Sequence, residues 1–313
     1  MATVDEEMTR SPFVWRPGDA AEAWRLKQSY GEESVYISGG TLLRTQWESG
    51  LTAIPKHLID LGSIPGITGV AVSSKELTIG AFTTLSAIRR DPLIDKYFPM
   101  LTEAVRVIAA PSVRNLATLG GNIASLVGDS LPALLVYEAE LLWHDGRGLH
   151  TQPLLDWLES SESNRQGRLL MQIKLPCSSE YTDSLDSMDS MDSMEKESAV
   201  DGKIKRFSAY DKVGRREAFT PSLVTTALWG YVDDSGNLGD VRLAAGGGQT
   251  TPCRLYACES LLNGRMIEPE LLQALHEQIL REYDPKGDMF ASAEYRKQTA
   301  ANVIAAGLWK QML

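Results

Sequence analysis

Hydrophobic and polar positions follow two periods along residues 12–177, and together they predict interleaved strands and helices. Short apolar or alternating runs predict strands, and apolar residues three or four positions apart predict helices. The predicted strands are 35–38, 57–61, 69–72, 76–80, 139–144 and 168–176. The predicted helices are 18–27, 41–48, a short helix capped by Thr84, 98–110 and 132–138. These helices are too few for a regular alternation of parallel strands and helices.

Residues 203–313 show a different order of elements. Strand patterns come first, at 204–212, 222–232 and 240–246, and helical patterns follow at 254–262, 268–283 and 292–312. Strands followed by helices are typical of an α+β domain, whose single sheet carries the helices on one face. We therefore predict the α+β fold class, with a three-stranded antiparallel sheet in this part.

The segment 178–202 separates these two parts and differs from both in composition. It contains a tandem Asp-Ser-Met repeat and almost no β-branched or aromatic residues. Such a segment buries too little apolar surface to offset the entropy lost on ordering. The sequence therefore predicts a flexible tail over 1–11, a first domain over 12–177, a disordered acidic linker over 178–202 and a C-terminal domain over 203–313.

Composition excludes several classes of function. The formal net charge of −10 argues against a nucleic-acid partner. No apolar run approaches the ~18 residues of a membrane-spanning helix, and the polar N-terminus lacks the apolar core of a secretory signal. The three cysteines contain no C-x-x-C pair, which fits a reducing cytoplasm, and they are too few for the usual four-thiolate iron–sulfur cluster. The four histidines show no metal-ligand spacing, so we predict no metal site.

Two pairs of adjacent glycines are the strongest candidates for a binding site. Gly39 and Gly40 follow a predicted strand and precede a predicted helix, whose N–H groups attract anions. Gly120 and Gly121 lie far downstream, in a motif that also carries the hydroxyl of Thr118 and the amide of Asn122. Glycine reaches positive φ readily, so backbone N–H groups at such turns can converge on an anion. Either pair alone is typical of an ordinary tight turn, but together they predict a site that grips one diphosphate from two sides.

Five motifs in this order resemble a known family. They are Ser38–Thr41, Arg114–Ala124, Asp129–Pro132, Tyr210–Arg216 and Ser292–Arg296. The chain resembles the FAD-binding medium subunit of molybdenum hydroxylases, the group that includes xanthine dehydrogenase and carbon monoxide dehydrogenase. The resemblance covers nearly the whole chain from about Pro12. It implies a two-subdomain FAD-binding fold of the vanillyl-alcohol-oxidase type, with a subdomain boundary near residue 61.

The resemblance also implies which residues contact the cofactor, while no side chain is needed as a catalytic acid or base. By this resemblance the FAD contacts are Tyr36, Ile37, Ser38, Gly39, Gly40, Thr41, Leu42, Leu43, Thr118, Leu119, Gly120, Gly121, Asn122, Asp129, Leu170 and Lys212. No histidine or cysteine falls in the glycine motifs, so we expect the FAD to be non-covalent.

Several of these residues also have a structural interpretation. Asp129 is a candidate N-cap for the helix after it, and Leu170 is a candidate core residue. Lys212 is a candidate solvated charge, and an alternative register places Asp211 at its position. We expect Arg114 to bond backbone carbonyls and hold its loop.

Other positions are expected to be structural, or depart from the family pattern. Tyr210 and Trp229 are predicted core aromatics, and Gly246–Gly248 is predicted to be a strand-to-loop turn. Leu42 stands where many members have an acid or an amide, and the chain between Asn122 and Asp129 is shorter than usual. These departures keep open a non-enzymatic scaffold that has lost FAD.

As a function, the resemblance implies an electron relay in the cytoplasm. A molybdenum subunit oxidises the substrate, [2Fe-2S] clusters on a small subunit carry electrons to FAD, and FAD passes them to NAD or to another acceptor. Because this chain lacks cluster cysteines, both other centres would belong to partner subunits. Xanthine is the expected substrate, and carbon monoxide, aldehyde or another heterocycle is the alternative.

Overall fold

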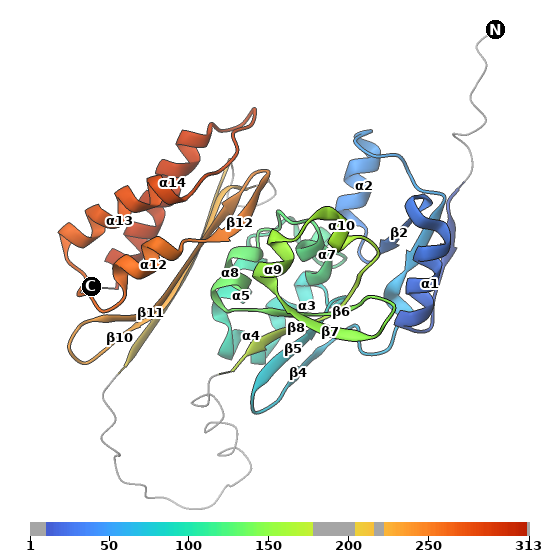
Figure 1. The fold of residues 1–313 in the computed structure, drawn as a ribbon, viewed down its shortest axis with the longest axis horizontal. Coiled ribbons are helices and arrows are strands. Elements are labelled where there is room, and N and C mark those ends of the chain that lie inside the picture. Colours follow the sequence, from blue (N-terminus) through green and yellow to red (C-terminus); the bar gives the residue numbers. More distant parts are fainter. Residues whose placement is uncertain (1–10, 178–203, 216–221, 312–313) are drawn as a thin grey trace, which may run out of the picture.

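The computed structural model describes residues 11–177, 204–215 and 222–311, which form three sheets with helices around them (Figure 1). The predicted acidic linker and nearly all of the predicted tail lie outside the described residues. Two hydrophobic cores divide the rest: one spans the first domain, and the other lies within the C-terminal domain.

The first subdomain is a small parallel sheet in the order β1-β3-β2, formed by β1 (Phe13–Trp15), β3 (His57–Asp60) and β2 (Ser34–Ile37). Helix α1 (Ala20–Tyr30) and helix α2 (Thr41–Glu48) connect these strands, with short 3₁₀ turns η2 (Gly31–Glu33) and η3 (Leu61–Ser63). Asp19 caps α1 by accepting a hydrogen bond from the N–H of Glu22. Helix α2 has the predicted bounds.

The second subdomain is built on a five-stranded antiparallel sheet. Its order is β4 (Val70–Val72), β5 (Glu76–Gly80), β8 (Leu169–Pro176), β6 (Glu140–His144) and β7 (Leu149–Pro153). The surrounding helices are α3 (Leu85–Arg90), α4 (Pro92–Tyr97), α5 (Pro99–Arg106), α6 (Pro111–Arg114), α7 (Leu119–Ala124), α8 (Leu131–Val136), α9 (Leu154–Glu159) and α10 (Glu162–Arg165). Thr84 caps α3 as predicted. Strand β8 lies at the centre of the sheet, so the last strand of the domain closes it.

The C-terminal domain has a four-stranded antiparallel sheet, so the prediction of three strands is wrong. Its order is β12 (Thr250–Arg254), β11 (Leu238–Gly247), β10 (Ser222–Val232) and β9 (Lys205–Gly214). The missed strand β12 is short and carries Pro252, a residue that a sheet accepts chiefly at its edge, which is where β12 lies. Helices α12 (Tyr256–Leu262), α13 (Pro269–Glu282) and α14 (Ala293–Trp309) follow.

The two faces of this sheet bury different partners. Leu228 and Leu243 belong to the core formed with α12, α13 and α14. Their neighbours Ala227 and Ala244 belong to the core of the first domain, where α8 packs against β10 and β11. Every residue of α8 is buried, which explains why its sequence is apolar on all sides. The interface places the end of the α7–α8 loop against the C-terminal sheet.

Candidate functional site

The two glycine motifs lie against each other, as the sequence predicted. The hydroxyl oxygens of Ser38 and Thr118 are 2.9 Å apart. A Cβ atom on Gly39 would lie 1.9 Å from the carbonyl oxygen of Leu116, so only glycine permits this approach. Two segments some 80 residues apart in sequence therefore lie side by side.

The first glycine motif connects strand β2 to the start of helix α2. Strand β2 ends at Ile37, and α2 begins at Thr41 after Gly40, whose φ of +65° is left-handed. The N-cap residue of α2 is Gly40, which has no side chain to cap this end, and the first turn of the helix contains no acidic residue. Because the first N–H groups of a helix lack intrahelical partners, this end has donors available for an anion.

The second loop differs from the prediction of converging N–H groups at a glycine turn. Gly120 and Gly121 lie in helix α7, and neither has a positive φ. The N–H groups of Leu119 and Gly120 donate to the carbonyls of Thr83 and Ala81 at 3.0 and 2.8 Å. That of Gly121 donates to the Thr118 hydroxyl at 3.1 Å. Helix α7 thus has its first N–H groups satisfied within the protein, and that part of the prediction is wrong.

Close packing explains the glycines of α7. A Cβ on Gly120 would lie 2.6 Å from the carbonyl oxygen of Ala81, whereas on Gly121 it would meet only side-chain hydroxyls at 3.1 Å or more. Leu119 and Gly120 are buried, and Gly121 is exposed. Gly121 is therefore the residue of this pair that a ligand can reach.

Asn122 holds the loop that leads to Asp129. Its side-chain Oδ1 accepts hydrogen bonds from the backbone N–H and the hydroxyl of Ser130, at 3.2 and 2.6 Å. Gly128 packs directly on the same amide, where a Cβ would lie 2.2 Å from Oδ1. The amide oxygen of Asn122 is thus used to shape the loop.

Asp129 joins the first domain to the C-terminal domain. Its Oδ2 lies 2.8 Å from Lys212 Nζ, its Oδ1 accepts from the Ser222 hydroxyl at 2.6 Å, and its carbonyl accepts from the Tyr210 hydroxyl at 2.7 Å. The side chains of Lys212 and Asp129 are 3% and 15% exposed, so the ion pair is largely shielded from water. Ser130, not Asp129, is the N-cap residue of α8, which rules out the capping interpretation.

The strand register distinguishes Lys212 from Asp211. Side chains alternate between the faces of a strand, so Tyr210 and Lys212 share one face of β9 and Asp211 lies on the other. Both Tyr210 and Lys212 contact Asp129, as described above. Burial raises the pKa of the Asp211 carboxyl, with a smaller contribution from Glu103 in the same direction, opposed by Lys310. Lys212, and not Asp211, therefore pairs with Asp129, and it is not a solvated charge.

The turn that follows α5 lies beside Lys212. Lys212 Nζ also donates to the carbonyl of Val107 at 3.1 Å, and Arg114 Nη1 donates to the carbonyls of Ile108, at 2.8 Å, and Ala109. The predicted loop-holding role of Arg114 is thus confirmed. The carbonyls of 107–109 are used by these cations and Ala109 has a φ of +45°, which explains why α5 ends before the predicted residue 110.

Leu170 is a buried core residue of β8, beside Trp143 of β6. Backbone hydrogen bonds link β8 to the second glycine motif, because the Ala81 N–H donates to the carbonyl of Met171 and the Ala81 carbonyl accepts from the N–H of Gly120. At the other side, the Tyr36 hydroxyl donates to the carbonyl of Gly167 at 3.3 Å, and burial raises the Tyr36 pKa.

Sequence reasoning did not identify the roles of Ser222 and Arg296. Arg296 is fully buried, and its guanidinium donates to the carbonyl of Leu223 and to Asp288 Oδ2, the latter at 2.6 Å. The predicted turn at Gly246–Gly248 lies on this guanidinium: a Cβ on Gly248 would meet Arg296 at 2.4 Å. Arg296 thus holds the strand end that presents Ser222 to Asp129.

The described ranges contain neither a metal-binding group nor a membrane-spanning helix. Within 11–177, 204–215 and 222–311, histidine, cysteine and acidic side chains form no group of three that could hold a metal ion. The helices in these ranges are either too short or too polar to cross a bilayer.

Comparison with known proteins gives two family matches that together span most of the chain. Residues 7–178 match the FAD binding domain in molybdopterin dehydrogenase, and residues 208–310 match the CO dehydrogenase flavoprotein C-terminal domain. The chain is 28% identical to the putative xanthine dehydrogenase FAD-binding subunit of Escherichia coli strain K12, over 77% of this chain and 76% of that protein. It is 26% identical to the carbon monoxide dehydrogenase medium chain of Hydrogenophaga pseudoflava, over 93% and 94%.

A solved structure has the same fold. A chain of the Hydrogenophaga pseudoflava carbon monoxide dehydrogenase that lacks the Mo-pyranopterin moiety aligns with a TM-score of 0.80 at 23% identity, covering 96% of this chain and 98% of that one. The two family matches cover the first and the C-terminal domains. The chain therefore belongs to the molybdenum hydroxylase family, as an FAD-binding medium subunit of the xanthine and carbon monoxide dehydrogenase type.

Proposed function

We propose that this chain holds FAD non-covalently between the two glycine motifs, and that the bound FAD passes electrons within a molybdenum hydroxylase complex. The observation that carries the proposal is the uncapped start of α2 beside Gly39 and Gly40, packed against the segment that leads to Thr118. These features fit a diphosphate, because backbone donors and a helix N-terminus attract an anion where no side chain blocks it. Neither motif contains a histidine or cysteine for a covalent link.

The residues of the proposed FAD site would have different roles. The backbone of Tyr36–Leu43 and the exposed Gly121 would contact the diphosphate and its neighbours. Leu119, Gly120 and Asn122 would act by holding the walls, since their polar groups bond within the protein. Leu170 would contribute apolar surface.

Asp129 and Lys212 would lie at the end of the proposed site that holds the flavin ring. When bound, FAD supplies the redox chemistry, and the protein supplies orientation and electrostatics. The shielded Asp129–Lys212 pair offers a fixed dipole at the joint between the domains, held by Ser222 and Tyr210. No acid or base from this chain is required for the electron transfer.

Both other redox centres would belong to partner subunits, a molybdenum-cofactor large subunit and a [2Fe-2S] small subunit. Three cysteines are too few for a four-thiolate cluster, and the relatives named above are subunits of such dehydrogenases. We place the complex in the cytoplasm, in line with the cysteine usage.

For the substrate we propose xanthine, with NAD as the electron acceptor. The identity to the Escherichia coli xanthine dehydrogenase subunit supports this assignment. Carbon monoxide or another substrate of this enzyme class is the second candidate, favoured by the longer alignment with the carbon monoxide dehydrogenase medium chain.

Purification of the native complex tests the proposal. The expected result is a yellow protein with one FAD per copy of this chain, two co-purifying subunits, and xanthine-dependent reduction of NAD. Carbon monoxide oxidation without xanthine oxidation would replace the substrate assignment. A colourless complex that takes up no added FAD would support the scaffold interpretation instead.

A further inference from the structure

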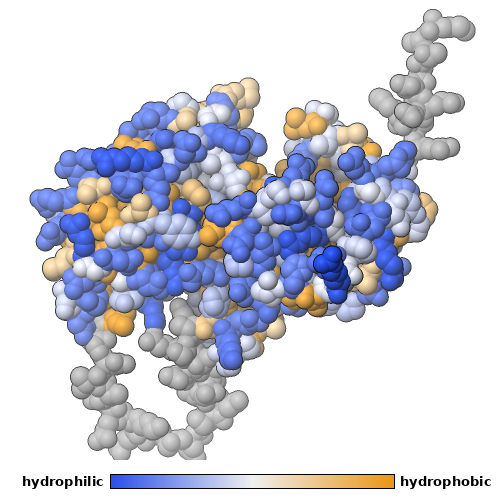
Figure 2. All heavy atoms as spheres, viewed as in Figure 1, coloured by the Kyte–Doolittle hydropathy of each residue, from blue (hydrophilic) through white to orange (hydrophobic). Residues whose placement is uncertain are grey.

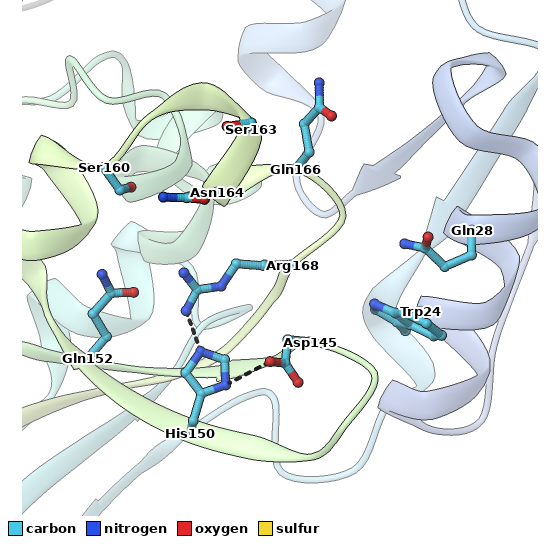
Figure 3. A pocket seen from close by; sticks show the side chains of 10 residues that line it. All are labelled: Trp24, Gln28, Asp145, His150, Gln152, Ser160, Ser163, Asn164, Gln166 and Arg168. Carbon is cyan, nitrogen blue, oxygen red and sulfur yellow. Dashed lines mark hydrogen bonds and ion pairs between the residues drawn. The ribbon is translucent and has the colours of Figure 1, made fainter.

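A polar pocket of about 530 Å³ lies apart from the proposed FAD site, between α1, the β6–β7 hairpin, α10 and the start of β8 (Figure 3). This part of the surface is largely hydrophilic (Figure 2). The pocket is lined by Trp24, Gln28, Asp145, His150, Gln152, Ser160, Ser163, Asn164, Gln166 and Arg168. None of these residues belongs to the proposed FAD site. Its volume lies in the range of small-molecule sites, about 300–1,000 Å³.

Arg168 is the fixed positive charge of this pocket. Its guanidinium lies 5.0 Å from the ring of Trp143 and 5.5 Å from that of Trp157, so the two indoles hold it in place. Its Nε is buried without a hydrogen-bond partner. Among the residues that the structure describes, Arg168 forms no ion pair. Burial lowers the pKa of the guanidinium, and the charge of Asp145 opposes this shift.

His150 separates Arg168 from the one acid in the lining. Arg168 Nη2 contacts His150 Nε2, and His150 Nδ1 lies 3.7 Å from Asp145 Oδ2 (Figure 3). A guanidinium only donates, so Nε2 must accept, and the neutral ring carries its proton on Nδ1, toward Asp145. The carboxylate thus interacts with Arg168 across an imidazole and leaves the guanidinium without a direct counter-ion.

The rest of the lining is neutral and polar. Four amides and two hydroxyls supply both donors and acceptors, from Gln28, Gln152, Asn164, Gln166, Ser160 and Ser163. Such a lining suits a hydrogen-bonding ligand better than an apolar one. We propose that this pocket binds a small organic anion, whose carboxylate or phosphate group pairs with Arg168 while the amides bond its remaining polar groups.

The experiment uses the FAD-loaded protein, so that FAD uptake is not mistaken for binding here. Citrate and glycerol 3-phosphate are titrated by calorimetry against chloride at matched ionic strength. The inference expects saturable binding of at least one probe; citrate alone identifies a carboxylate ligand, and glycerol 3-phosphate alone a phosphate ligand. Binding of neither, beyond the chloride control, overturns it.

Three variants locate the site. Arg168→Gln is expected to weaken binding about tenfold or more, because a charge-assisted contact is lost. Gln152→Glu adds a repelling carboxylate at the pocket without touching the buried indoles, and keeps the test valid if Arg168→Gln fails to fold. Arg147→Gln is the matched control, since Arg147 is exposed on the same hairpin and does not line the pocket. Equal losses in Arg147→Gln and Gln152→Glu would show nonspecific attraction and refute the site.

Discussion

A single charge at the start of α2 separates cofactor binding from folding. Thr41 is the first residue of α2, in an uncapped turn without acidic residues. Thr41→Glu places a carboxylate where the helix dipole favours it, so the free energy of unfolding is expected to rise by about 0.3–1 kcal/mol. The same carboxylate would stand beside the FAD diphosphate and repel it.

The size of this repulsion follows from Coulomb's law. Two unit charges about 5 Å apart repel by about 1 kcal/mol in water and about 3 kcal/mol at the lower effective dielectric of a protein surface. The side chain of Thr41 is half-buried, so the environment lies between these limits. Affinity for FAD should therefore fall about five- to 150-fold while stability is kept.

The assay is titration of FAD into deflavinated protein, followed by flavin fluorescence, with thermal unfolding in parallel. Thr45→Glu is the control, because Thr45 is exposed one turn further along the same helix. The reasoning is refuted if Thr41→Glu binds FAD as tightly as the native chain, or if Thr45→Glu loses as much affinity.

Three further predictions concern stability, each measured by denaturant unfolding. Gly120→Ala is expected to lower the free energy of unfolding by about 1–3 kcal/mol, because the added methyl group overpacks against Ala81. Gly121→Ala should leave this free energy unchanged or raise it by up to about 1 kcal/mol, because alanine has the higher helix propensity. Equal losses in the two variants would contradict the packing argument. Lys212→Met should lower the free energy of unfolding by about 3 kcal/mol, because it leaves the Asp129 carboxylate buried and unpaired. Adding Asp129→Asn to this variant should recover part of that loss. If the effects of the two substitutions simply added, Asp129 and Lys212 would not be coupled. Burial raises the Asp211 pKa in the folded state, so the folded state holds this proton more tightly and loses stability as pH rises from the ordinary carboxyl pKa through the raised one. Asp211→Asn should therefore stabilise the protein at neutral pH and have little effect in acid; a stabilisation that does not change with pH would contradict this assignment.

Much of the fold was predictable because local patterns determined it. The bounds of α2 and β10 match their apolar periods, and Asp19 and Thr84 cap the helices as their side chains suggest. Strand β12 was missed because its Pro252 argues against a strand, and only pairing along β11 makes it one. The contact of Lys212 with the turn after α5 comes from a distant part of the chain and leaves no local signal.

The candidate site also combines features that were predictable from local sequence with features that were not. The contact between the glycine motifs was predictable, since glycine permits the close approach that Gly39 makes to Leu116. The conformation at Gly120 was not, because its N–H partner Ala81 lies just after β5, far away in the sequence. Likewise, Asp129 was identified as a site residue, but its ties to Ser222 and Tyr210 depend on how the C-terminal sheet docks.

A crystal structure of the FAD-loaded protein tests the central claim most directly. The account predicts diphosphate density at the start of α2, within contact of Gly40 and Gly121, with the flavin ring toward Asp129 and Lys212. Diphosphate density anywhere else, including the Arg168 pocket, would contradict it.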